Sequence, residues 1–527
     1  MKRIFVAFNH ILIFYTIFIS IWGVSDLFTD NLILPKWIFC MIGLTLFTLG
    51  YSIGALFNRI IDFKVSYIFH FIIAIASLQA FYGILQHMQS ENIFSKQPIT
   101  GCFDNPAGFA SCLCFSLPFA CTLLSSQKKY LRYIGLSSTT IIVIAIFLSL
   151  SRAGIITITA ILFIWICKSK HLKNNAIKYV FTIIFSLIFA GCYLWKKDSA
   201  DGRLFIWKCS LTLAKESPIT GHGIGCFNRE YMDTQAKYFH ENGIDNKHAM
   251  LASNVNHPFN EYLNLFLNFG AIGLIILVCL MIWLHQCYKK NTGKMKKEAS
   301  YALLSIGIFS FFSYPFNYPF TWLITFTCIA LIANDSIKHI YKPLKVQYIL
   351  GIVTLIFSLW NSVQLTMRIN AEMEWDRAFE SSFTKNMKNV LPKYKSLEQY
   401  FMENPYFLYN YAIILQNYGQ HAKSLKIASL CNHYWGNYNL ELIMGDNLTQ
   451  LNNYKKAEKH YQQASLMCPS RFLPLYKLLQ LYKQNGDKRL LRKTASAILS
   501  KPIKHKTGTI MMIKKEAERI LNVTNQQ

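Results

Sequence analysis

The sequence carries little charge for its length. Only 15% of its 527 residues are charged, and Asp and Glu are especially scarce, at 27 against 54 Lys and Arg. The 14 cysteines form no CxxC pair and show no Cys/His spacing typical of a metal site. No basic patch in a polar segment is interleaved with aromatic residues, so the formal charge of +27 does not indicate nucleic-acid binding. These absences turn attention to the apolar residues.

Apolar residues make up 53% of the chain and are concentrated before about residue 370. They form about eleven blocks, most of them close to the 20 residues that cross a bilayer as a helix. The blocks lie near residues 4–24, 33–57, 65–85, 107–126, 131–150, 153–167, 177–195, 262–284, 301–313, 318–333 and 347–367. The sixth block is marginal and the ninth is short. We therefore predict an all-α, polytopic membrane domain over residues 1–369.

Positive charge orients this domain, because short cytoplasmic loops collect Lys and Arg, which meet anionic lipid headgroups. Alternate connections carry Lys2 and Arg3; Arg59 and Lys64; Lys128, Lys129 and Arg132; Lys168, Lys170, Lys173 and Lys178; Lys289, Lys290, Lys294, Lys296 and Lys297; and Lys338, Lys342 and Lys345. We expect these connections and the N-terminus to be cytoplasmic. The first block is long and no small-x-small cleavage site follows it, which favours a retained anchor over a signal peptide. The long polar loop, 196–258, and everything after residue 370 then face outward.

The chain becomes polar and rich in helix-forming residues after Arg368. Residues 418–429 align with 452–465 at an offset of 35, so that Ala422 falls on Ala457 and Ser429 on Ala464. An offset near 34 resembles tetratricopeptide repeats. We predict a helical linker over 370–403, about three repeats forming a soluble α-helical solenoid over 404–505, and a tail over 506–527. The alternative is an arbitrary amphipathic helical domain. A repeat array would bind a protein partner.

Three outward-facing residues are candidates for chemistry. Arg152 stands where one apolar span ends and the next begins, a depth at which arginine either snorkels or meets an anion. Arg203 lies in the long loop, where arginine is also common without a function. His257 stands just before the eighth span, and an imidazole can accept a proton near neutral pH, although histidine is also an ordinary interface residue. Asn260, Glu261 and Asn264 follow within about two helical turns and could orient it.

The glycines of "PITGHGIGCF", residues 218–227, could be mistaken for a nucleotide fingerprint. No strand precedes them, and they face the wrong compartment for dinucleotides. We instead expect a tight turn that lets two backbone segments approach closely. In the same compartment a disulfide could form, although the sequence does not assign a pair. The candidate thiols are those of Cys102, Cys209, Cys226, Cys431 and Cys468.

Several motifs occur together in a characteristic order. They are "GCFDNPAGFA" before a span, "LSRAG" at a span junction, "GRLFIW" and "PITGHGIGCF" in the long loop, "NHPFNEYLNLFLNFGAIGL" entering the next span, and "FSYPFNYP" between residues 311 and 319. This ordered set, over roughly residues 95–335, resembles the O-antigen ligase family. That group of bacterial envelope glycosyltransferases includes lipopolysaccharide ligases, polysaccharide polymerases and O-oligosaccharyltransferases.

The resemblance implies transfer of a glycan carried on undecaprenyl diphosphate at the outer face of the bacterial inner membrane. Arg152 and Arg203 match the family's diphosphate-binding arginines, and His257 matches its base. The family's commoner pattern is HNxYL, whereas here Pro258 follows the histidine and the asparagine comes later, as Asn260. Supporting roles fall to Asn105, Asn260 and Glu261. The acceptor is the hydroxyl of lipid A core, of a polysaccharide or of a protein, and no metal or other cofactor is required.

Two other functions remain open. A metal-dependent glycosyltransferase would place paired carboxylates in the first outer loop, where Asp26 and Asp30 lie. Those two acids are more simply loop residues beside a membrane boundary. A transporter of lipid-linked glycans, or a scaffold that uses the repeats, would not be an enzyme. Transporters usually carry charges inside spans or broken helices related between two halves, and the sequence shows no clear duplication.

Overall fold

The computed structural model describes residues 2–57, 65–89, 98–168, 175–290, 293–337, 344–383 and 389–525. Within these ranges every regular element is a helix, as the all-α prediction requires. Some of the charged residues that predict the orientation lie outside these ranges. Arg59, Lys64, Lys170, Lys173, Lys338 and Lys342 lie outside the described residues, as does the first part of the outer connection from Glu91. The sidedness of the chain therefore stays a prediction.

The chain divides into two compact units. The membrane unit comprises Met1–Trp195, Phe259–Glu261 and Ile276–Asp376. The polar unit comprises Lys196–Pro258, Tyr262–Ile275 and Arg377–Gln527. The long loop thus belongs with the C-terminal segment and not with the spans that flank it in sequence. Sequence patterns gave no sign of this association, because no local periodicity links segments about 200 residues apart.

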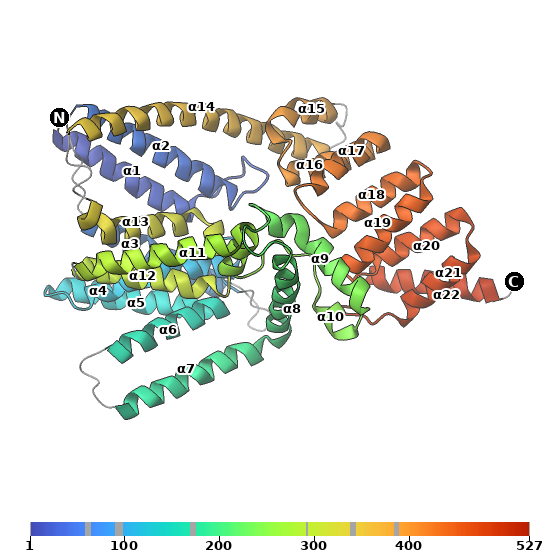
Figure 1. Ribbon diagram of the computed structural model, residues 1–527, viewed down its shortest axis with the longest axis horizontal. Coiled ribbons are helices and arrows are strands. Elements are labelled where there is room, and N and C mark those ends of the chain that lie inside the picture. The colour runs from blue at the N-terminus through green and yellow to red at the C-terminus, as the bar shows by residue number, and fades with distance from the viewer. Residues whose placement is uncertain are drawn as a thin grey trace. The chain divides into compact units, whose positions relative to one another are not determined.

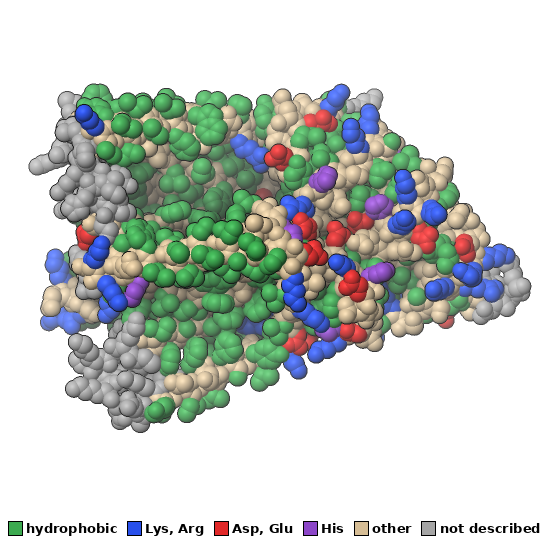
Figure 2. Space-filling model, in the orientation of Figure 1, with side chains coloured by type: hydrophobic (Ala, Val, Ile, Leu, Met, Phe, Trp, Pro, Cys, Tyr) green, Lys and Arg blue, Asp and Glu red, His purple; other side chains and the backbone are tan. Residues whose placement is uncertain are grey.

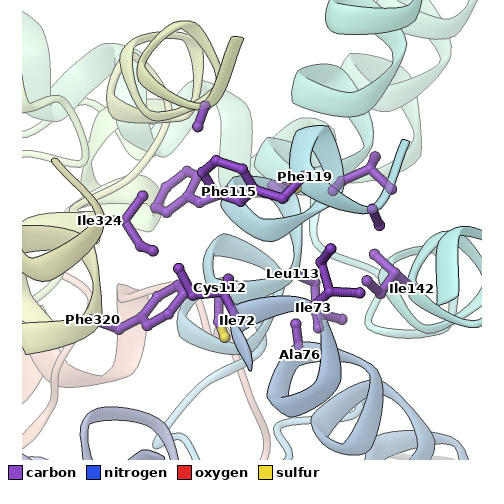
Figure 3. Packing of buried hydrophobic residues seen from close by; sticks show 14 of the residues in the cluster. Ile72, Ile73, Ala76, Cys112, Leu113, Phe115, Phe119, Ile142, Phe320 and Ile324 are labelled. Carbon is purple, nitrogen blue, oxygen red and sulfur yellow. The ribbon is translucent and has the colours of Figure 1, made fainter. Parts of the chain in front are cut away.

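The membrane unit is a bundle of helices around a large apolar core. Its elements are α1 (Lys2–Trp22), α2 (Leu34–Leu56), α3 (Val65–Gln89), α4 (Pro106–Leu123), α5 (Lys129–Leu148), α6 (Arg152–Lys168), α7 (Asn175–Trp195), the later part of α11 (Glu261–Lys290), α12 (Lys294–Ser310), the short η1 (Pro315–Asn317), α13 (Pro319–Ile337) and α14 (Leu344–Ser382). Helix α4 lies at the centre, with 78% of its 18 residues buried. Figure 3 shows Phe115 and Phe119 of α4 packed among side chains of α3, α5 and α13.

Six of these helices are long and apolar enough to cross a membrane: α2, α3, α4, α5, α11 and α14. Four shorter apolar helices lie in α1, α6, α7 and α13. The ninth predicted span corresponds to α12, which belongs to neither group; it has 17 residues and carries Lys296 and Glu298 in its first turns. The chain thus has several candidate membrane spans, but the count of eleven stays a prediction. Figure 2 shows hydrophobic side chains over much of the exposed surface of α11 and of the part of α14 before Arg368, as expected for lipid-facing helices.

The polar unit is also helical. It contains α8 (Lys197–Ala214), α9 (Cys226–Asn242), α10 (Asn246–Leu251), the first part of α11, α15 (Val390–Phe401), α16 (Pro405–Asn417), α17 (His421–Asn432), α18 (Tyr438–Gln450), α19 (Tyr454–Met467), α20 (Leu473–Asn485), α21 (Lys488–Ser500) and α22 (Gly508–Asn525). From α16 onward the helices form successive pairs with short connections, and each helix packs on the next (Figure 1). Local chemistry fixes their ends: Asn404 caps α16, and Gly486 ends α20 in the left-handed conformation, with a φ of 75°.

The internal alignment of the C-terminal segment is corrected by burial. Ala422 is exposed, although it was aligned with Ala457, which is fully buried against the neighbouring helix. The second helices of the first two pairs instead begin at His421 and Tyr454, which brings the buried Ser424 onto Ala457 and Cys431 onto Ala464. The offset of 35 aligned one pair of alanines but did not align the buried faces of the two helices. The assignment of these pairs to tetratricopeptide repeats remains a prediction.

Candidate functional site

Asn105 starts α4 and joins it to a distant turn of the membrane unit. Its Oδ1 accepts a hydrogen bond from Gly108 N at 2.8 Å, which satisfies an amide of the first helical turn. Its Nδ2 donates to the hydroxyls of Tyr318 at 2.8 Å and Tyr314 at 3.1 Å. The Tyr318 hydroxyl in turn donates to Asp104 Oδ1 at 2.6 Å. The "FDNPAG" and "FSYPFNYP" motifs are therefore one hydrogen-bonded network, and Asp104 and the two tyrosines are members that sequence analysis did not single out.

Glu261 contacts the same turn from a third motif. Its Oε1 accepts a hydrogen bond from Phe316 N at 3.2 Å. Two residues earlier, Phe259 holds a φ of 55°, unusual for a residue with a side chain, and its ring packs edge-on to Tyr314 with centroids 5.4 Å apart. The membrane unit thus brings Asn105 and Glu261 to one turn.

Arg152 is the first residue of α6, at a turn built by two serines. Ser149 Oγ donates a hydrogen bond to Ile146 O at the end of α5, and Ser151 Oγ accepts one from Gly154 N at the start of α6. Between them Leu150 adopts a φ of 53°. A Cβ on Gly154 would lie 2.9 Å from Ala110 Cβ, so the start of α6 packs closely on α4, the helix that Asn105 caps. The turn holds a half-buried arginine at the very end of a helix.

In the polar unit, the glycine motif pairs with the kink of α11. His222 N donates to Leu267 O at 2.9 Å and Gly223 N donates to Asn268 O at 3.0 Å. In return Ala271 N donates to Pro218 O at 2.9 Å. The helix is interrupted there at Gly270, which has a φ of 59° and a ψ of −154°. The predicted tight turn with close backbone approach is confirmed.

Arg203 and His257 lie on neighbouring segments of the polar unit. Arg203 is in the second turn of α8, four residues before Trp207 and so on the same helix face. Trp207 Nε1 donates to the carbonyl oxygen of Pro258, the residue that follows His257, at 2.8 Å. This bond joins the helix of the candidate arginine to the segment of the candidate base. The indole was missed because its partner is a backbone carbonyl, which leaves no mark in the sequence.

The structure therefore groups the predicted site residues in two sets. Asn105, Arg152 and Glu261, with the adjacent Asn260, lie in the membrane unit, whereas Arg203 and His257 lie in the polar unit. Lys36 is a further residue that sequence analysis passed over. It is fully buried at the start of α2, where its Nζ donates to Gly23 O at 2.8 Å and Leu32 O at 3.0 Å. Lys36 could have been noticed in the sequence, because it is a lysine on the side expected to be periplasmic, where the general charge pattern has few.

One cluster in the polar unit could hold a metal ion. Ligand atoms of His222, Cys226 and Glu230 lie within 4.8 Å of one another. Arg229 binds the other oxygen of Glu230, with Nη2 to Oε1 at 2.7 Å. Burial raises the pKa of Cys226 to about 12, so its thiol holds a proton that a metal would have to displace. The three side chains are of types that bind metal ions, but Arg229 already forms an ion pair with Glu230, the only carboxylate among them.

The cysteines facing the expected outer compartment are all free thiols. Cys209, Cys226, Cys431 and Cys468 are buried in the polar unit, and Cys102 is partly buried in the membrane unit.

Comparison with known proteins bears on the segment that carries most of these residues. Residues 138–278 match the family model described as O-antigen ligase, and a search of curated proteins finds no match. The matched segment runs from α5 into α11 and includes Arg152, Arg203 and His257. The match supports the O-antigen ligase family for this chain and indicates a function of that type, in glycan transfer or polymerisation.

Proposed function

We propose that this protein transfers a glycan from undecaprenyl diphosphate to an acceptor hydroxyl at the outer face of the bacterial cytoplasmic membrane. One observation carries the proposal: a single matched O-antigen ligase segment, residues 138–278, contains both candidate arginines and the candidate base. The candidate membrane spans suit a donor that is half lipid and half sugar. The hydrogen-bonded turns that hold Asn105 and Glu261 add support, because they preorganise polar groups beside apolar helices.

The arginines suit the leaving group. A lipid-linked diphosphate gains negative charge on its oxygens as the anomeric carbon–oxygen bond breaks. A guanidinium can bind two such oxygens at once and stays charged throughout. We assign this role to Arg152 and Arg203. Because the diphosphate is already a good leaving group, the reaction requires no metal.

The histidine suits the nucleophile. A ring nitrogen of His257 takes the proton of the acceptor hydroxyl while that oxygen forms a bond to the anomeric carbon. The carbon–phosphate oxygen bond breaks in the same step, and undecaprenyl diphosphate leaves with the electron pair. A single displacement of this kind inverts the anomeric configuration. The proton then passes from the imidazolium to solvent.

Substitution tests these roles in full-length protein reconstituted in lipid with a lipid-linked donor. His257→Ala should lower transfer by about 10²- to 10⁴-fold, the usual contribution of a general base. His240→Ala, an exposed histidine of α9, is the matched control and should keep full activity. Arg152→Lys should also be impaired, since a point charge lacks the bidentate fork. Transfer at the normal rate by a folded His257→Ala protein would refute the base assignment.

The acceptor is proposed only as a hydroxyl, of lipid A core, of a growing polysaccharide or of a protein. A deletion strain separates these cases. Loss of surface polysaccharide attachment indicates a ligase, altered chain length indicates a polymerase of the same family, and loss of glycoprotein signal indicates an oligosaccharyltransferase. Product formation from donor that is already on the outer face would exclude a role limited to transport.

The metal-dependent rival needs a sharper test than chelation alone. Inhibition by EDTA would point to the carboxylates of the first outer loop only if no other metal site existed, and His222, Cys226 and Glu230 could form one. The assay should therefore compare the wild type with Cys226→Ser, which removes that donor set. Transfer that EDTA leaves unchanged in both proteins supports the metal-independent reaction.

A further inference from the structure

The long loop and the C-terminal helices of the polar unit are joined by hydrogen bonds between residues far apart in sequence. Helix α9 packs directly on α19. Five contacts link the two segments: Gly436 N to Asn228 O, Gln463 Nε2 to Asp233 Oδ1, Gln235 Nε2 to Met467 O, Lys504 Nζ to Met250 O, and Trp435 Nε1 to Asn256 Oδ1. They run along the loop from the start of α9 to the residue before His257. The C-terminal helices thus support much of the loop.

The central contact is a buried glutamine on α9. Gln235 is fully buried, and each side of its amide has a partner. Its Oε1 accepts from the Tyr231 hydroxyl at 2.7 Å, while its Nε2 donates to Met467 O at 2.5 Å and to Ser253 O at 3.3 Å. A buried amide is stable only when it is hydrogen-bonded. The end of α19 therefore supplies a hydrogen-bond acceptor that the buried amide of the loop requires.

The contact nearest the candidate base is made by a tryptophan. Trp435 lies between α17 and α18, and its ring packs on Tyr406 and Tyr409 of α16 at centroid distances of 5.3 and 5.7 Å. This packing orients the indole, whose Nε1 donates to Asn256 Oδ1 at 3.2 Å. On the other side, Trp207 Nε1 holds the Pro258 carbonyl at 2.8 Å. His257 is therefore bracketed by two indole donors, one from the loop and one from the C-terminal helices.

We infer that the C-terminal helices are part of the catalytic unit, and that Trp435 is a positioning residue that holds the His257 segment through Asn256. The inference rests on the proposed role of His257. Bonds on both sides of one residue restrict its backbone, so its imidazole is presented in a narrow range of positions. Loss of one of these bonds keeps the histidine in the site but widens the range of positions that its backbone segment adopts.

The test uses Trp435→Phe in the full-length protein, because phenylalanine keeps a packed ring and removes the donor. Its kcat should fall about 3- to 10-fold with little change in the KM for the donor, as expected for one hydrogen bond that acts through geometry. Amide hydrogen exchange over residues 253–257 should become faster. Tyr476→Phe, which removes a bond to Glu516 within the C-terminal helices, is the matched control and should change neither quantity.

A double-mutant cycle assigns the effect to the bond. Asn256→Ala should lower kcat as Trp435→Phe does, and the double variant should lose no more than either single variant. Additive losses, or unchanged exchange over residues 253–257 in Trp435→Phe, would overturn the inference. Should Trp435→Phe fail to fold, Asn256→Ala alone must show the same faster exchange and lower kcat. Absence of transfer by the wild type would instead reject the proposed function, and the exchange data would still show whether Trp435 holds the segment.

Discussion

At the scale of single residues, two glycines of one motif have different reasons for being glycine. Gly221 and Gly223 both adopt positive φ, of 70° and 87°. A Cβ on Gly221 would lie 2.5 Å from the backbone carbon of Asn268, whereas a Cβ on Gly223 would have no atom within 4 Å. The sequence predicted a close backbone approach here, but it did not distinguish the glycine that needs space from the one that needs only its φ.

Substitution should separate these two requirements. Gly223→Ala should cost about 1 kcal/mol, the strain of a left-handed residue. Gly221→Ala should be worse by a few kcal/mol, because neither backbone can move without breaking the pairing of the motif with α11. Thermal unfolding in detergent and hydrogen exchange over residues 218–223 would measure both. Equal effects of the two substitutions would contradict the assigned close approach.

At the scale of elements, helix types and many ends followed from local chemistry, whereas the face that each helix buries did not. Apolar blocks predicted the candidate spans, and Asn-Pro at 404–405 marks the start of α16. The offset between the C-terminal pairs was wrong because small residues occur on exposed helix faces as well as buried ones. Burial depends on the neighbouring helix, and one helix's own sequence does not fully specify that neighbour.

The corrected register makes a test. Ala457→Leu should destabilise the α18–α19 pair by about 1–3 kcal/mol, because the fully buried position has no room for three more carbons. Ala422→Leu should be nearly neutral, since that residue is exposed. Hydrogen exchange in α17 and α19 reports each pair separately. Similar damage from both substitutions would restore the original alignment.

A buried acid in the same pair predicts a pH dependence. Burial raises the pKa of Glu441 above 4.5, while its hydrogen bond to His460 opposes the shift. Between 4.5 and the raised pKa the folded state binds more protons than the unfolded state, so stability falls as pH rises through that window. Glu441→Gln does not titrate, and its stability relative to the wild type should rise with pH there. A difference between the two proteins that stays constant with pH would show that burial does not control this carboxyl.

At the scale of the whole molecule, the similarity to O-antigen ligases and the membrane character were readable from ordered motifs and composition. The grouping of the loop with the C-terminal helices was not, because it rests on contacts such as the bond from Gln235 to a backbone carbonyl 232 residues away. Every residue has a backbone carbonyl, so the sequence does not show which one accepts such a hydrogen bond. The candidate site residues could be named one by one, but the side chains that hold them, such as Trp207 and Trp435, could not.

Truncation tests this grouping. Removal of residues 377–527 should abolish transfer and make α9 sensitive to protease, because Gln235 and Asn256 lose their partners and the α9 face that packs on α19 becomes exposed. Membrane insertion of the remaining chain should be unaffected. A truncated protein with normal transfer would show that the C-terminal helices are not part of the catalytic unit.

The long sequence separation between α9 and α19 also determines how long the loop exists during synthesis before its partner helices are made. At roughly 5–20 residues per second of synthesis, the 232 residues between Gln235 and Met467 take roughly 10–50 s to make. During that time the face of α9 that carries Gln235 has no partner from the C-terminal helices. These groups of the nascent loop therefore stay uncovered until the C-terminal helices are made, and we expect the loop to bind a chaperone during that time.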